Sequence, residues 1–221
     1  MIDPTIFRAY DIRGVVDETL TETAVYEIAR AIGTMAHELG QQRIVVARDG
    51  RESSSALCEI LIKGLTSTGR DVIDIGMVPT PLLYFATYHL ETGSGVMITG
   101  SHNAAEYNGL KIMLDGNTLS GEEIKDIQNH TYSADYAVGQ GDVWHVDITA
   151  DYIRRITEDI PAHSGPPLKI VVDCGNGAAG ILAPQLLNAL GHDVVELYCE
   201  IDGKFPNHHP DPSQPENLKD L

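Results

Sequence analysis

The chain has 221 residues, enough for one large domain or for one domain and part of a second. Its 32 acidic and 15 basic residues give a formal net charge of -17, which argues against nucleic acids and anionic membrane surfaces as partners. The hydrophobic content of 43% is ordinary for a packed core, and no apolar run approaches the roughly 18 residues of a membrane span.

The N-terminus and the cysteines bear on location. The chain begins Met-Ile-Asp-Pro, without the basic and apolar regions of a signal peptide. Cys58, Cys174 and Cys199 are odd in number and lack C-x-x-C spacing, so we expect free thiols in a reducing compartment. These features predict a cytoplasmic protein.

The first elements follow a strand and helix alternation. Residues 7–14 (Phe-Arg-Ala-Tyr-Asp-Ile-Arg-Gly) form an irregular entry, and helical spacing then runs from an N-cap at Thr21 to Gly40. Residues 43–47 are a continuous apolar strand of the buried parallel type. Residues 48–51 (Arg-Asp-Gly-Arg) follow at its carboxyl end. Their arginines fit either a structural network with the aspartate or contacts to a substrate.

The alternation continues. Ser53 or Ser54 should cap a helix that stops near Gly69, residues 71–75 form a strand, and residues 79–81 (Pro-Thr-Pro) start a third helix. Strand and helix in alternation indicate a doubly wound α/β layer.

The loop of residues 99–103 (Thr-Gly-Ser-His-Asn) lies between strands predicted at 95–98 and 110–114. Gly100 and the Asn108-Gly109 pair should supply the permissive backbone that a tight excursion needs. The carboxyl ends of strands are where α/β domains bind ligands, so the loop is a candidate site, although most such clusters are ordinary loops. Neighbours on an extended chain point apart, so Ser101 and His102 do not form a hydrolase pair.

The second half opens another unit. Ser120 and Glu123 suggest a capping box for a helix through Asn129, and periodicity is lost over residues 132–144. A helix follows at about 149–160, with an exit loop at 161–167. We therefore expect a three-layer αβα domain with a mixed, mostly parallel sheet at residues 1–147. An incomplete second α/β domain should occupy residues 148–221.

Two motifs in the second unit offer other readings. Gly175-x-Gly177-x-x-Gly180 follows a strand at 169–173, and Glu196 lies at the spacing of a ribose-binding acid, which suggests a dinucleotide-dependent oxidoreductase. Asp173 weakens this, because its carboxylate would face the pyrophosphate. Residues 205–212, with adjacent His208 and His209 between prolines, fit a rigid loop better than a metal cluster.

Three motifs resemble those of the α-D-phosphohexomutases, the bacterial phosphomannomutase/phosphoglucomutase enzymes. They are residues 7–14, the loop at 99–103 with Tyr107-Asn108-Gly109-x-Lys111, and the stretch ending in Pro-Glu-Asn-Leu at 215–218. A proline usual in the family loop is replaced here by Ala104 or Ala105.

The resemblance implies a set of roles. Ser101 would carry the phosphoryl group and, through it, a Mg²⁺ ion. Lys111 would act as general base, with Arg13 and His102 assisting in catalysis. Tyr10, Arg13, Asn103 and Lys111 would contact the substrate. Such phosphoryl transfer depends on positioning and charge neutralisation.

The resemblance also implies the reaction and its limits. The parent enzyme would interconvert hexose 1- and 6-phosphates through a 1,6-bisphosphate, with glucose 1,6-bisphosphate as activator. The 221 residues match only the first domain and part of the second, without the family's metal loop, so we expect this chain to turn over poorly or not at all. A non-catalytic sugar-phosphate-binding module is therefore a third hypothesis. Apolar edge surface on the partial second domain would invite association.

Overall fold

The computed structural model describes residues 2–160 and 166–221. Its helices are α1 (Glu22–Glu38), α2 (Ser54–Ser67), α3 (Thr80–His89), α4 (Glu122–Ser133), α5 (Thr149–Asp159) and α6 (Ala183–Ala189), with 3-10 turns η1 (Pro4–Ile6), η2 (Ala178–Ile181) and η3 (Pro215–Leu218). Its strands are β1 (Ile12–Val15), β2 (Arg43–Arg48), β3 (Asp71–Met77), β4 (Gly95–Ile98), β5 (Tyr107–Leu114), β6 (Asn117–Thr118), β7 (Val143–His145), β8 (Lys169–Asp173) and β9 (Asp193–Leu197).

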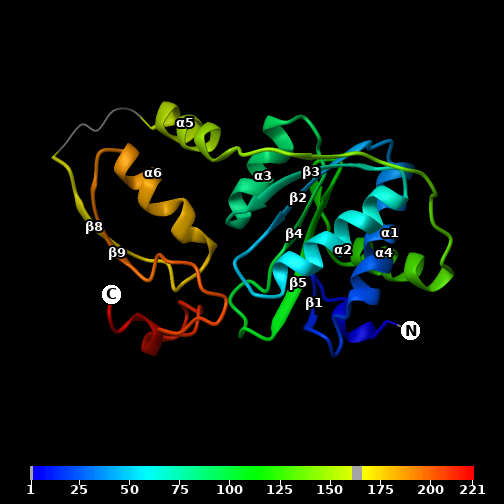
Figure 1. Cartoon of the computed structure of the whole chain (residues 1–221), viewed down its shortest axis with the longest axis horizontal. Coiled ribbons are helices and arrows are strands. Elements are labelled where there is room, and N and C mark those ends of the chain that lie inside the picture. Colours follow the sequence, from blue (N-terminus) through cyan, green and yellow to red (C-terminus); the bar gives the residue numbers. More distant parts are fainter. Residues whose placement is uncertain (1, 161–165) are drawn as a thin grey trace.

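The first unit is built on a mixed sheet whose strand order is β1-β5-β4-β2-β3-β7, with β6 beside β5. Strands β4, β2, β3 and β7 run parallel, whereas β5 is antiparallel to both β4 and β1. The predicted fold class is confirmed. Figure 1 shows α1 and α2 on one face of this sheet and α3 on the face turned toward α6.

Two buried clusters lie on the two faces of the sheet, because successive side chains of a strand point to opposite sides. Along β2, Ile44 and Val46 join the cluster beneath α1 and α2, while Val45 and Ala47 join the one beneath α3. All four are fully buried. The continuous apolar run at 43–47 is therefore explained by helices covering both faces of the sheet.

The start and end of α1 agree with the prediction. Thr21 accepts a hydrogen bond from the backbone N–H of Ala24 at 3.2 Å, and Gly40, with φ +71°, follows the helix in the left-handed region that glycine tolerates.

Other predicted ends were wrong in detail. Ser53 occupies the N-cap position of α2 without a side-chain capping bond. At α4 only half of a capping box forms: the backbone N–H of Ser120 donates to Glu123 Oε2 at 3.0 Å, but the residue at the N-cap is Gly121. That helix also runs to Ser133, beyond Asn129.

The backbone around the candidate loop was also predicted incorrectly. Asn108 and Gly109 lie within β5, not in a turn, and neither they nor Gly100 have a positive φ. Tight packing accounts for both glycines. A Cβ on Gly109 would lie 2.2 Å from the carbonyl oxygen of Ile12 on β1, and one on Gly100 would lie 2.4 Å from Cζ of Arg51.

The second unit contains the parallel pair β8 and β9 with α5 and α6, and it packs against the α3 side of the first. Leu182 and Ile148 belong to the same buried cluster as Leu82 and Leu83 of α3. Along the chain, β7 comes between the two units, and the sequence analysis did not predict it. It pairs with β3 at the edge of the large sheet. Most of the predicted exit loop lies outside the described residues.

Candidate active site

The loop at 99–103 leaves the carboxyl end of β4, next to the end of β2. Thr99 is still tied to the sheet, since its backbone N–H donates to the carbonyl of Gly109 at 3.0 Å. The loop then turns back, and the N–H of Asn103 donates to the carbonyl of Gly100 at 3.1 Å. The chain thus makes a short excursion at the strand edge where ligands bind in α/β folds.

Ser101 lies at the tip of this excursion. Its φ of 56° is in the left-handed region, which is uncommon for a residue with a Cβ and is found at sites where the surrounding structure fixes the backbone. Its N–H donates to Thr99 Oγ1 at 2.9 Å, and its side chain is exposed. The conformation therefore presents the hydroxyl to solvent.

Arg51 holds the loop from beneath. Its Nη1 donates to the carbonyls of Ala104 at 2.6 Å and Tyr107 at 3.1 Å, and its Nη2 to those of Ser101 at 3.0 Å and Asn103 at 2.7 Å. The Nε donates to Asp49 Oδ2 at 3.2 Å. All five N–H groups of the guanidinium are thus used. Arg51 is only 3% exposed, and burial lowers its pKa against the opposing effect of the Asp49 carboxylate.

Asp49 connects this arginine to the start of α2. Its carboxylate accepts hydrogen bonds from the backbone of Gly100 at 3.2 Å and from the hydroxyl of Ser54 at 2.5 Å. Asn108 of β5 in turn donates to the hydroxyls of Ser53 and Ser54, each at 2.9 Å. These serines therefore belong to the support of the loop, which explains why neither caps the helix with its side chain.

The cations come from the antiparallel pair β1 and β5, in which Arg13 lies opposite Gly109. Arg13 donates to the side chains of Asn103 and Asp11. The same Asp11 carboxylate lies 3.7 Å from Nζ of Lys111. Asp11 thus joins both cations, and the Nε of Arg13 is buried with no hydrogen-bond partner in the described part of the chain.

Tyr10 and His102, like Ser101, are exposed members of the predicted set. Tyr10 is 74% exposed, and His102 is exposed on the loop. A hydrogen bond from the hydroxyl of Ser213 is the main cause that lowers the pKa of Asp211, and the charge of His102 contributes less. His102 therefore lies near the C-terminal segment of the second unit.

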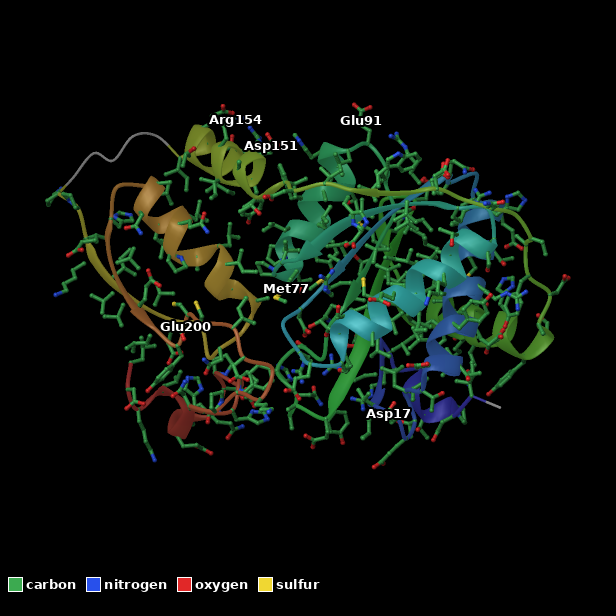
Figure 2. All side chains as sticks on the ribbon, viewed as in Figure 1. Asp17, Met77, Glu91, Asp151, Arg154 and Glu200 are labelled. Atoms are coloured by element: carbon green, nitrogen blue, oxygen red, sulfur yellow. The ribbon has the colours of Figure 1, made fainter. Side chains whose placement is uncertain are left out.

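A cavity of about 210 Å³ separates the two units at this point. Ser101, Thr99 and Asp49 line it from the first unit, and residues of the turn at 177–179 with Phe205 line it from the second. In Figure 2, Met77, the last residue of β3, lies between the two lobes. A larger cavity of about 660 Å³ lies at the start of α1, away from Ser101.

Sequence reasoning did not assign Arg51 or Asp11 to the site. The signal for Arg51 was the Arg-Asp-Gly-Arg stretch after β2, and the structure shows the Asp–Arg network that was one of its two readings. Arg48, in the same stretch, instead lies 3.7 Å from Asp74. Asp11 lies between Tyr10 and Arg13 in the first motif, but only the pairing of β1 with β5 brings it to Lys111.

The site does not by itself provide a full metal shell. Among residues 2–160 and 166–221, no group of three or more His, Cys, Asp or Glu side chains is arranged to hold an ion. A phosphate on Ser101 would offer oxygen ligands to Mg²⁺, an ion that proteins usually bind through phosphate oxygens, one or two carboxylates and several waters.

The glycines of the dinucleotide-like motif have packing roles. A Cβ on Gly180 would lie 1.9 Å from the carbonyl oxygen of Cys199, and one on Gly175 would lie 3.1 Å from the ring of His208. The motif also leads into the 3-10 turn η2 and not directly into a helix. The carboxylate of Asp173 lies 3.0 Å from Nε2 of His208. This Asp–His pair therefore occupies the turn that would receive a pyrophosphate.

Fold and site together define a two-unit α/β protein with an exposed serine on a loop that Arg51 braces. Arg13 binds Asn103 of the same loop, and Asp11 links Arg13 to Lys111. Two family patterns match the chain: phosphoglucomutase/phosphomannomutase alpha/beta/alpha domain I over residues 4–137, and domain II over residues 150–221. The chain belongs to this phosphoglucomutase/phosphomannomutase family.

Individual relatives agree. The chain is 54% identical over 217 residues to a phosphomannomutase/phosphoglucomutase of Pseudomonas aeruginosa, covering 98% of this chain and 46% of that protein. It is 49% identical over 218 residues to a phosphoglucomutase of Neisseria meningitidis serogroup B, covering 98% and 47%. A crystal structure of a family protein from Burkholderia thailandensis superposes with a TM-score of 0.95 at 44% identity, covering 100% of this chain and 50% of that one. The chain thus spans about half the length of these relatives.

No helix in the described part of the chain is both long enough and apolar enough to cross a membrane.

Proposed function

We propose that this chain carries the phosphoryl-bearing serine of a phosphohexomutase, which interconverts hexose 1-phosphate and hexose 6-phosphate through a 1,6-bisphosphate. The observation that carries the proposal is Ser101 itself: an exposed hydroxyl in a left-handed conformation, braced by Arg51, two residues before the Asn103 that binds Arg13. The names of the relatives support the same substrate class.

Ser101, Lys111, Arg13 and His102 have separate roles in the proposed phosphoryl transfer. The P–O bond to Ser101 breaks while a hydroxyl of the hexose phosphate takes the phosphoryl group. Lys111 takes the proton of that hydroxyl as general base. Arg13 and His102 neutralise charge on the moving phosphoryl group, which is the main demand of this chemistry. The bisphosphate then reorients and returns its other phosphoryl group to Ser101.

Substrate contacts in this proposal come from Tyr10, Arg13, Asn103 and Lys111. The buried Nε of Arg13 supports this, because an N–H without a partner is satisfied when a phosphate oxygen reaches it. A guanidinium is suited to the task, since it remains charged and its planar fork fits phosphate oxygens.

Mg²⁺ dependence is general in the family, and we include the ion and glucose 1,6-bisphosphate as activator in the proposal. When bound, Mg²⁺ would neutralise charge on the phosphoryl group, with a Ser101 phosphate oxygen as one ligand. The expected domain limits, 1–147 and 148–221, and a cytoplasmic location are likewise parts of this proposal.

Labelling of the serine tests the proposal. The chain is incubated with glucose 1,6-bisphosphate and Mg²⁺, and its intact mass is measured. We expect a gain of one phosphoryl group, mapped to the peptide that contains Ser101, and no gain in Ser101→Ala. Ser133→Ala, at an exposed serine at the end of α4, is the matched control and should label like the wild type. Equal labelling of Ser101→Ala would refute the assignment.

Binding without turnover has an observation in its favour, namely that the chain spans about half of its relatives. We expect labelling of Ser101 but very weak conversion of glucose 1-phosphate into glucose 6-phosphate by the 221-residue chain. A coupled assay that measures glucose 6-phosphate separates the two steps. Turnover in the usual enzyme range of about 1–1000 s⁻¹ would show that these residues suffice for the reaction.

A further inference from the structure

Two of the three cysteines come together at the carboxyl ends of β8 and β9, the two neighbouring parallel strands of the second unit. Cys174 follows β8 directly, and Cys199 follows β9 after Tyr198. Their Sγ atoms are 3.4 Å apart, the contact of two reduced thiols in a weak S–H hydrogen bond. Both residues are partly buried, whereas Cys58 is a residue of α2 that is buried in the core of the first unit.

The backbone around this pair is fixed independently of the thiols. The N–H of Cys174 donates to the carbonyl of Leu197 at 3.0 Å. Asn176, only 5% exposed, donates its backbone N–H to the carbonyl of Tyr198 at 2.8 Å and its side-chain amide to that of Glu200 at 2.8 Å. These bonds hold the two strand ends together on both sides of Cys199. The two sulfur atoms therefore stay close in the folded chain. A rotation of the two side chains is all that a disulfide bond between them would require.

Cys199 differs from Cys174 in lining a cavity. Cys199 lines a cavity of about 350 Å³ together with Asn176, Tyr198 and two acidic residues, Glu196 and Glu200. Glu200, labelled in Figure 2, marks the place beside the end of β9. The carboxylates repel anionic reagents such as a glutathione disulfide, and they admit small neutral ones.

We propose that Cys174 and Cys199 form an oxidisable dithiol, a modification site at which a peroxide produces a reversible disulfide. The Cys199 thiol loses its proton and the thiolate attacks one oxygen of the peroxide. The O–O bond breaks, the leaving hydroxide takes up that proton as water, and a Cys199 sulfenic acid remains. The Cys174 sulfur then attacks the Cys199 sulfur and displaces the hydroxyl as a second water. Two thiols and one hydrogen peroxide thus give one disulfide and two waters.

The order of attack follows from the environment of each thiol. Burial, followed by the hydrogen bond with Cys199, raises the pKa of Cys174 to about 12. Because the thiolate is the nucleophile, Cys174 serves as the resolving thiol and Cys199, which lines the cavity, as the one oxidised first. The second step should accelerate as the pH rises.

The bridge would link two segments that line the cavity opposite Ser101. The turn at 175–180 begins at Cys174, and the segment containing Phe205 begins at Cys199. Oxidation would therefore restrict this wall of the candidate active site, and it would also limit the unfolded chain by closing a loop. This inference rests on the second unit alone and does not depend on the proposed mutase activity.

Treatment of the whole 221-residue chain with hydrogen peroxide tests the proposal. After denaturation, iodoacetamide should label three thiols in the reduced protein but only Cys58 in the oxidised one. Peptide mapping should show a Cys174–Cys199 cross-link that dithiothreitol removes, and it separates this product from oxidation of the five methionines. The midpoint of thermal unfolding should rise on oxidation and fall back on reduction.

Variants assign the steps. Cys174→Ser should accumulate a sulfenic acid at Cys199 that dimedone traps, whereas Cys199→Ser should show neither sulfenic acid nor cross-link. Cys58→Ala should behave like the wild type. The proposal is overturned if wild-type Cys199 proceeds to sulfinic acid without a cross-link, or if the disulfide involves Cys58. Equal reactivity with glutathione disulfide and hydrogen peroxide would contradict the role of the acidic cavity.

Discussion

At the scale of single residues, Arg51 explains how an exposed loop keeps one conformation. Backbone carbonyls that leave regular structure need donors, and water supplies them in most loops. Here one buried guanidinium donates to four carbonyls between Ser101 and Tyr107. Its planar fork satisfies them together, which an ammonium group at the same place would not do.

Arg51→Ala should therefore be costly in stability and in function. It leaves Asp49 and four carbonyls without their donor, and loss of one partner of a buried ion pair costs about 3–5 kcal/mol. Urea unfolding measures this cost, and Arg43→Ala, at an exposed arginine of β2, should stay within about 0.5 kcal/mol of the wild type. Arg51→Lys retains the charge but not the planar guanidinium. The folded Arg51→Lys variant should therefore be phosphorylated at Ser101 by glucose 1,6-bisphosphate more slowly than the wild type. Wild-type labelling by the lysine variant would contradict the bracing role.

Arg13 allows a direct test of the phosphate contact. Arg13→Gln removes the cation, and hydrogen bonds to charged groups are worth about 1.5–3 kcal/mol, so labelling of Ser101 should slow by roughly 10- to 150-fold. Mass spectrometry at timed intervals gives the rate. Arg8→Gln, at an exposed arginine five residues earlier, is the control and should keep the wild-type rate. An unchanged rate in Arg13→Gln would remove this residue from the site.

At the scale of elements, the docking of the C-terminal segment on β8 depends on His208. Its ring binds both oxygens of Asp173, at 3.1 and 3.0 Å, and packs edge-on against the ring of Tyr198. The hydroxyl of Tyr198 donates in turn to Asp220 at 2.7 Å. Two contacts thus hold the C-terminal segment: His208 binds Asp173 at the end of β8, and Tyr198, which follows β9, binds Asp220.

This docking should weaken with rising pH. The hydrogen bond to the carbonyl of His209, with further contributions from Asp173, raises the pKa of His208 above its ordinary 6.5. A raised pKa in the folded state means that its stabilising contribution is fully present below pH 6.5 and is lost as the pH rises through the higher value. Urea unfolding across pH 5.5–8.5, a range of about one to two units around 6.5, should show this decline. The decline of the unfolding free energy with pH should be smaller in His208→Gln and unchanged in His209→Gln. An equal pH dependence in the two variants would contradict the role of His208.

At the scale of the whole molecule, two units meet at one buried cluster and enclose the cavity at Ser101 between them. The second unit is less completely covered than the first. Val171 and Val195 are register partners on β8 and β9, and they are 42% and 36% exposed on the same face of this small sheet. Adjacent exposed valines on a two-stranded sheet are a surface on which another chain can pack.

We expect the chain to self-associate weakly through this face. The net charge of -17 opposes association, so added salt should strengthen it by screening the repulsion. Sedimentation velocity at rising protein and salt concentrations measures the effect. Val171→Lys should keep the chain monomeric, whereas Val138→Lys, at an 87% exposed valine outside this face, should not. Association that is unaffected by Val171→Lys would assign the contact to another surface.

Much of the fold could be predicted because its elements are encoded locally. The apolar run at 43–47, the N-cap at Thr21 and the helix start at Pro79-Thr80-Pro81 each depend on neighbours a few residues apart. Strand β7 escaped prediction for the opposite reason. It has only three residues, all exposed, and its identity as a strand comes from pairing with β3.

The sequence by itself determined the α/β alternation, the position of the serine loop at a strand end, and the motifs that indicate the family. The tertiary structure alone decided that Arg51 braces this loop, that Asp11 joins Arg13 to Lys111, and that Cys174 meets Cys199. The physical reason is that propensity and periodicity act over a few residues. These contacts instead join segments that are distant in the chain, or depend on strand pairing and register, so only the packed sheet brings them together.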